Sequence, residues 1–201
     1  MTEQSAWTRI TQQDPGHSAA YVQRFRDLAA QGFDLAGEAR LVDAMLPRGS
    51  RVLDAGCGPG RTGGWLGGVG HDVVGVDVDP VLVAAAEEDH PGPRWLVGDL
   101  AELDLPARGV PEPFDAIVAA GNVMAFLAPS TRVVVLRRLR AHVTPRGRAA
   151  IGFGAGRGYA FDDFRADARD AGWAEDLLLS TWDLRPFTPD SDFLVAVLRP
   201  S

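Results

Sequence analysis

Short runs rich in β-branched and apolar residues alternate along this chain with stretches of helical periodicity. The runs predict strands at residues 51–55, 73–77, 94–97, 114–120, 148–153, 177–182 and 193–198. The periodic stretches predict helices at residues 18–32, 35–46, 61–69, 80–89, 129–142 and 160–171. Such alternation is typical of α/β folds, in which helices cover both faces of a mostly parallel sheet.

The character of the runs supports this fold class. Residues 73–76 and 116–120 are apolar without interruption, as expected of parallel strands covered on both faces. The last two runs differ, because only Arg185–Asp192 separates them and a helical crossover needs a dozen or more residues. We therefore expect an antiparallel pair to end the sheet.

The charged residues and the single cysteine exclude several classes of protein. All 20 basic residues are arginine, so Schiff-base chemistry and a Walker phosphate loop are ruled out. With 27 acidic residues the net charge is −7, which argues against broad nucleic-acid binding. One cysteine and four scattered histidines predict neither a disulfide nor a metal site. Without a signal-like or membrane-spanning segment, we expect a cytoplasmic protein.

A glycine-rich turn follows the first expected strand, in the segment Val52–Gly60 (VLDAGCGPG). Glycine tolerates positive φ and has no side chain, so the backbone can turn sharply there and approach a ligand closely. The next two strands each end in a carboxylate, Asp77 and Asp99. Because ligands of open α/β sheets bind at the carboxyl ends of the strands, we expect a ligand site there. Asp79 precedes Pro80, which predicts a helix N-cap.

These segments resemble the class I S-adenosylmethionine-dependent methyltransferases. The resemblance is carried by Asp54–Gly60, Gly75–Pro80, Gly98–Leu100 and Phe114–Asn122, within residues 36–155. It implies an α/β fold with a Rossmann-like seven-stranded, mostly parallel sheet, helices on both faces and the last strand antiparallel. It further suggests a single methyltransferase domain over 36–201, preceded by an N-terminal helical lid segment over 1–35.

The resemblance implies S-adenosylmethionine (SAM) as the cofactor. The cofactor-binding residues that it implies are Asp54, Gly56, Cys57, Gly58, Gly60, Asp77, Val78, Asp99, Leu100, Gly121 and Asn122. In the family, a carboxylate at the position of Asp77 holds the ribose hydroxyls and one at Asp99 takes the adenine amino group. Charge agrees independently, because SAM is a net cation and a rim of carboxylates would attract it.

Two other functions stay open. Residues Gly58–Gly63 also satisfy the pattern G-x-G-x-x-G of an NAD(P)-dependent oxidoreductase. Against that function, Pro59 lacks a backbone donor for a pyrophosphate and Asp54 adds negative charge. A non-catalytic adenosyl-cofactor-binding protein would keep the same loop and transfer nothing.

The acceptor is predicted to be a small molecule. Family members that methylate amino groups of nucleic-acid bases or of glutamine carry an Asn/Asp-Pro-Pro-aromatic motif after the fourth strand. The corresponding segment Gly121–Met124 lacks both prolines. Together with the acidic charge, this argues against nucleic acid as the partner. Tyr159, Trp182, Arg185 and Phe187 are candidates to line an acceptor pocket, and for each of the three aromatic residues packing in the core or in the final hairpin is the open alternative.

Methyl transfer from a sulfonium needs alignment of the reacting groups more than a catalytic side chain. A base is required only where the acceptor must lose a proton. Position in the sequence makes His17, Tyr21 and Asn122 the candidates for such a role. Cys57 is expected to be unreactive, since no histidine is adjacent in sequence to activate it.

Overall fold

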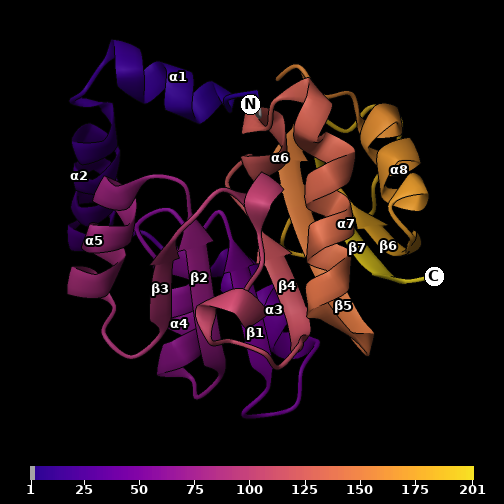
Figure 1. Ribbon diagram of the computed structural model, residues 1–201, viewed down its shortest axis with the longest axis horizontal. Coiled ribbons are helices and arrows are strands. Elements are labelled where there is room, and N and C mark those ends of the chain that lie inside the picture. The colour runs from indigo at the N-terminus through magenta and orange to yellow at the C-terminus, as the bar shows by residue number, and fades with distance from the viewer. Residues whose placement is uncertain (1–2) are drawn as a thin grey trace.

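The computed structural model describes residues 3–201 (Figure 1). The described chain forms a seven-stranded sheet with the order β3-β2-β1-β4-β5-β7-β6. The strands are β1 Arg51–Ala55, β2 Asp72–Asp77, β3 Arg94–Val97, β4 Phe114–Ala119, β5 Val143–Gly154, β6 Trp173–Leu179 and β7 Phe193–Pro200. Neighbours from β3 to β5 pair in parallel, whereas β7 runs antiparallel to both β5 and β6. The expected fold class is therefore confirmed.

Helices lie on both faces of the sheet and above its upper edge (Figure 1). They are α1 Ala6–Gln13, α2 His17–Ala30, α3 Gly37–Ala44, α4 Arg61–Gly68, α5 Pro80–Asp89, α6 Val123–Phe126, α7 Arg132–His142 and α8 Phe161–Asp170. Short 3-10 turns occur at Leu100–Glu102, Pro106–Arg108 and Pro129–Thr131. The strands β1 to β5 point upward in this view, so their carboxyl ends meet beneath α1 and α6.

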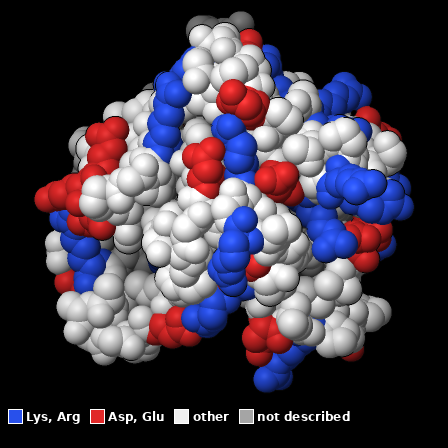
Figure 2. Space-filling model, turned by 90° about the horizontal axis from the view of Figure 1, so that it is seen from below, with Lys and Arg blue, Asp and Glu red and all other residues white. Residues whose placement is uncertain are grey.

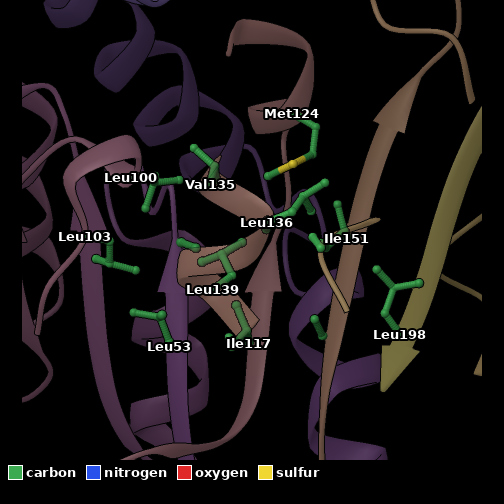
Figure 3. Close-up of a cluster of buried hydrophobic side chains, with 14 of the residues drawn as sticks. Leu53, Leu100, Leu103, Ile117, Met124, Val135, Leu136, Leu139, Ile151 and Leu198 are labelled. Atoms are coloured by element: carbon green, nitrogen blue, oxygen red, sulfur yellow. The ribbon is translucent and has the colours of Figure 1, made fainter. Parts of the chain in front are cut away.

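Apolar side chains fill the space between the sheet and α7. Each of the strands β1, β4, β5 and β7 contributes a buried branched side chain to this core. Helix α7 and the segments near it cover these side chains in Figure 3. The residues labelled there are Leu53, Leu100, Leu103, Ile117, Met124, Val135, Leu136, Leu139, Ile151 and Leu198. Burial on this scale fixes the sheet, and with it the positions of the strand ends.

The elements differ from the sequence expectation in four places. Helices α1 and α6 had not been predicted, and α6 is a single turn of four residues. Strand β5 begins at Val143, directly after α7, although its first residues include Pro145 and Gly147, which are typical of turns. Strand β6 begins at Trp173 instead of 177. The added residues include the polar Glu175, which is tolerated because β6 is an edge strand and Glu175 pairs with Arg165 at 2.9 Å.

The underside of the molecule carries charges of both signs. Figure 2 shows this face, where arginine and acidic side chains are interleaved. At the amino-terminal ends of the strands, Arg51 lies 3.4 Å from Asp72 and 3.1 Å from Glu112. Within residues 3–201, the helices are too short or too polar for any of them to cross a membrane. Nor do the His, Cys, Asp and Glu side chains of this range form a group that could hold a metal ion.

We predict that Gly75→Ala destabilises the sheet. A Cβ atom at Gly75 would lie 2.2 Å from the ring of Trp95, which is itself buried on β3. Overpacking of this kind lowers the free energy of unfolding by about 1–3 kcal/mol, which a urea titration would measure. Gly68→Ala is the matched control, because nothing lies within 4 Å of its Cβ position. Equal midpoints for the two variants would contradict the prediction.

Candidate active site

A cavity opens where the carboxyl ends of β1 to β4 meet the N-terminal helices. Helices α1 and α2, with the residue before α1, contribute Ser5, Trp7, Tyr21 and Phe25. The segments after β1 and β2 contribute Asp54, Gly56, Cys57, Gly58, Pro59, Arg61, Thr62, Asp77, Val78 and Leu82. The segments after β3 and β4 contribute Gly98, Asp99, Leu100, Ala120, Gly121, Val123, Phe126 and Leu127. Nine of the eleven predicted cofactor-binding residues are thus brought together.

The loop after β1 is held by backbone hydrogen bonds to the end of β2. The amides of Gly56 and Cys57 donate to the carbonyl oxygen of Val76, at 2.8 and 3.1 Å. The amide of Gly58 donates to Oδ2 of Asp77 at 2.8 Å. Gly56 has a φ of 79° and Gly58 one of 54°, values that favour glycine. The loop therefore lies flat against the strand ends and forms the floor of the cavity.

The two predicted residues that lie outside the cavity lining have structural roles. Gly60 precedes α4 with a φ of 80°, and a Cβ atom there would lie 2.8 Å from Ala86. Its missing side chain thus leaves room for Ala86 of α5 and for the ring of Trp95 on β3. Asn122 has a φ of 69°, and its Oδ1 accepts from the amide of Gly154 at 2.8 Å. That bond ties the segment after β4 to the end of β5.

Two buried carboxylates, Asp54 and Asp77, line the cavity from the neighbouring strands β1 and β2. Oδ2 of Asp54 accepts from the amide of Gly63 at 2.8 Å, and Oδ1 of Asp77 accepts from the amide of Asp79 at 3.0 Å. Burial raises the pKa of Asp54 to about 7 and that of Asp77 to about 6; the charge of Asp77 adds to the first shift and that of Asp79 to the second. Both groups would be stabilised in their ionised form by a bound cation.

The end of β3 supplies the third carboxylate. Oδ1 of Asp99 accepts from the amide of Ala101 at 2.8 Å, which caps the 3-10 turn Leu100–Glu102. The amide of Gly98 donates to the carbonyl oxygen of Asp77 at 2.8 Å, so the ends of β2 and β3 are held together. Asp99 and Leu100 line the cavity with Val78, as the resemblance implies.

Arg61 is a cavity residue that sequence reasoning missed. Its guanidinium donates to both carboxylate oxygens of Glu38, at 2.7 and 2.6 Å, and lies 5.5 Å from the ring centroid of Phe25. The ion pair joins residues 23 positions apart, which no local pattern indicates. The sequence feature that could have indicated Arg61 is its position as the first residue of the helix that follows the glycine loop.

Aromatic rings close the cavity from above. The ring of Trp7 meets those of Tyr21 and Phe126 edge to face, at centroid distances of 5.3 and 5.5 Å. Tyr21 lines the cavity, and burial raises the pKa of its hydroxyl. His17 packs beside Trp7 at 5.2 Å and lies outside the lining. The sequence had indicated neither Trp7 nor Phe126.

The four candidates for an acceptor pocket lie outside the cavity lining, and the three aromatic residues take the packing alternative. Tyr159 is buried and donates to Oδ2 of Asp167 at 2.6 Å. Trp182 packs over Gly152, and Phe187 lies against the ring of Phe161 at 5.7 Å. Arg185 is exposed, 3.6 Å from Asp183. The first three stabilise the packing around β5 and the segment between β6 and β7.

Comparison with known proteins identifies the family. Residues 52–147 match the family model described as a methyltransferase domain. A TehB-like SAM-dependent methyltransferase from Corynebacterium glutamicum is 50% identical, with a TM-score of 0.88 over 94% of this chain and 100% of that one. The chain belongs to the SAM-dependent methyltransferase family. A SAM-bound amino pentose methyltransferase from Micromonospora echinaspora has the same fold, with 18% identity, a TM-score of 0.67 and coverage of 89% and 96%.

Curated relatives differ in the acceptors that their names give. Magnesium-protoporphyrin O-methyltransferase of Rhodobacter capsulatus is 34% identical over 70% of this chain and 61% of its own length. Ribosomal RNA small subunit methyltransferase C of Chromohalobacter salexigens is 34% identical over 52% of this chain and 32% of its own. The chain thus spans less than two thirds of each of these relatives. Family membership alone does not select the acceptor.

We predict that SAM affinity rises with pH between about 5 and about 8, because the cationic cofactor favours ionised carboxylates whose pKa values burial raises. Calorimetry in buffers of different ionisation enthalpy would show protons released on binding below about pH 7. Asp54→Asn removes the carboxyl group with a pKa of about 7. The affinity of that variant should then change with pH only near 6, where Asp77 ionises. An affinity for SAM that does not change with pH would contradict this prediction.

The same pKa shifts have the opposite effect on the stability of the cofactor-free protein. A raised pKa means that the folded state keeps its proton at a pH where the unfolded chain has lost it. The free energy of unfolding should therefore fall as the pH rises from about 4 to about 7, and Asp54→Asn should flatten that fall. Urea titrations across this range would measure the slope.

Proposed function

We propose that this protein transfers the methyl group of SAM to a small-molecule acceptor by in-line displacement. The observation that carries the proposal is the covered cavity, in which α1 and α2 lie over the glycine loop and the carboxylates of β1 to β3. A site covered in this way can align a small acceptor with the cofactor and keep water out.

The residues present fit the cofactor. At Gly56 the missing side chain makes room for Val123, which would lie 2.4 Å from a Cβ atom there, whereas at Gly58 the space is open, with the nearest atom 3.9 Å away on Tyr21. In this proposal the loop lies under the methionine part, Asp77 holds the ribose hydroxyls and Asp99 takes the adenine amino group. When bound, SAM supplies an electrophilic methyl group on a sulfonium, whose positive charge is lost as the methyl leaves.

The acceptor side is proposed to be the part of the cavity between α1 and the segment after β4. Trp7, Val123, Phe126 and Leu127 give it apolar walls. Of the three candidates for proton transfer, Tyr21 alone lines the cavity, and its raised pKa keeps it a hydrogen-bond donor at neutral pH. Tyr21 in this form cannot take a proton from the acceptor. We therefore expect the nucleophilic atom of the acceptor to be unprotonated when it binds.

Two observations support a small acceptor over a nucleic acid. The net charge is −7, whereas binding a phosphate backbone needs a positive field. Three of the four arginines of α7 donate to backbone carbonyl oxygens: Arg132 to Gly158, Arg138 to Leu103 and Arg140 to Gly172. The cytoplasmic setting and the division at residue 35 stay predictions, and residues 1–2 lie outside the described part of the lid segment.

Of the two alternatives, family membership argues against an NAD(P)-dependent oxidoreductase. The buried carboxylates Asp54 and Asp77 agree, because they would repel a pyrophosphate. A non-catalytic cofactor-binding protein is distinguished by experiment. We would incubate the protein with methyl-labelled SAM and, separately, a metabolite extract and total RNA. Label in a small molecule is expected, label in RNA would overturn the small acceptor, and SAM binding without transfer would indicate a binding protein.

We predict that Asp77→Asn weakens SAM binding by about tenfold or more, because the ribose loses a charged acceptor worth about 1.5–3 kcal/mol. Isothermal calorimetry at neutral pH would measure the change. Asp72→Asn is the matched control, since Asp72 starts the same strand at the opposite edge of the sheet and is exposed. Its affinity should equal that of the wild type. Equal affinity for Asp77→Asn would remove the ribose assignment.

A further inference from the structure

The carboxylate of Asp79 makes more bonds than its role as a helix cap requires. Oδ1 accepts from the amide of Val81 at 2.8 Å, which is the N-cap bond expected from the sequence. Oδ2 accepts from Nε1 of Trp7 at 2.8 Å and also from the hydroxyl of Ser18. These two donors come from residues 72 and 61 positions away in the sequence, and Asp79 is only 6% exposed. The carboxylate therefore joins the N-terminal segment to α5.

Helix α1 depends on these bonds for its position. It has eight residues, all within the described chain, and none of them is buried. A helix of this length is marginal on its own in water. In Figure 1 it crosses the top of the molecule from α2 toward α6. It is held by Trp7, through Asp79 and the rings of Tyr21 and Phe126, and by an exposed bond of 2.6 Å between Glu3 and Ser130.

Helix α2 has a further attachment to α5 that does not use Asp79. Val22 packs against Leu82 in a buried cluster between the two helices, and Trp7 of α1 packs against the same cluster. Arg26 donates to Asp89 and Glu88 at 2.8 Å on the exposed side of the same contact. The carboxylate of Asp79 is thus needed most by α1, because α2 would remain docked without it.

The turn that carries Asp79 also carries the carboxylate that faces the cavity. The amide of Asp79 donates to Oδ1 of Asp77, while the side chain of Asp79 accepts from Trp7 and Ser18. Trp7 lines the cavity, whereas Asp79 does not. One turn of three residues, 77–79, therefore positions both the floor of the site and its cover.

We propose that Asp79 is a positioning residue that latches α1 over the cavity and so slows the release of bound SAM. Opening would break the bond to Trp7 and swing α1 outward while α2 stays in place. The part of the proposal that concerns SAM rests on the cofactor assignment made above. The latch itself is a property of the cofactor-free protein and can be tested without any ligand.

Asp79→Asn separates the latch from the cap. The amide oxygen of asparagine caps a helix as well as aspartate does, whereas its NH₂ group cannot accept from Trp7 or Ser18. In the cofactor-free Asp79→Asn variant, the amides of α1 should exchange at least about tenfold faster than in the wild type, because the charge-assisted bonds from Trp7 and Ser18 are lost. The amides of α5 should exchange as in the wild type, which verifies that the cap and the fold are intact.

Two further variants make the test specific. Trp7→Phe keeps an aromatic ring but removes the N–H donor, so it should reproduce the fast exchange of α1 and add little in combination with Asp79→Asn. Arg26→Gln is the matched control, because it removes an exposed bond between α2 and α5 that does not involve α1. Exchange of α1 in that variant should be unchanged.

The cofactor readout is the dissociation rate of SAM, measured by stopped-flow fluorescence. We expect dissociation to be about tenfold faster in Asp79→Asn than in the wild type. Unchanged exchange of α1 in Asp79→Asn with α5 intact would overturn the latch. Fast exchange of α1 with an unchanged SAM dissociation rate would overturn its role in retaining the cofactor. If the wild type does not bind SAM, the proposed function fails, and the exchange experiment still decides the latch.

Discussion

The site depends on the hydrogen bonds between the loop after β1 and the end of β2. Gly56 and Cys57 donate to one carbonyl oxygen, and Gly58 donates to the carboxylate of Asp77. These bonds make the loop follow the strand ends instead of rising into the cavity, and they give a buried carboxylate the donors that it needs. Because the amides come from a backbone at positive φ, the arrangement requires glycine at Gly56 and Gly58.

The other walls are connected to this floor through short contacts. Val123, at the start of α6, lies against Gly56, where a Cβ atom would be 2.4 Å away. Asn122 ties the same segment to β5 through the amide of Gly154. Four strand ends are thereby fixed relative to each other, so the polar groups of the site are positioned by the sheet itself. Only the cover formed by α1 is attached through a few side chains.

Sequence reasoning predicted the parts of the structure that are encoded locally. The sheet, the glycine loop and the carboxylates at the ends of β2 and β3 follow from patterns within a few residues of each other. It missed contacts between distant residues: Arg61 with Glu38, Trp7 with Asp79, and the closing ring of Phe126. It left Tyr159 and Trp182 between an acceptor pocket and internal packing, because an aromatic residue near a strand end has the same pattern whether it faces a cavity or the core. Gly60 stays a predicted cofactor residue, and its missing side chain also leaves room for Ala86 and Trp95.

The position of β7 has a consequence for how this chain acquires its structure. β7 is made after every other strand, yet it lies between β5 and β6 and pairs with both. During synthesis β5 therefore presents an open edge, and β6 has no partner until residues 193–200 emerge. An unpaired edge of this kind can join the edge of another chain. The half of the sheet that carries the glycine loop and Asp77 can assemble first, so the growing chain is most exposed to misassembly on the side away from its cofactor site.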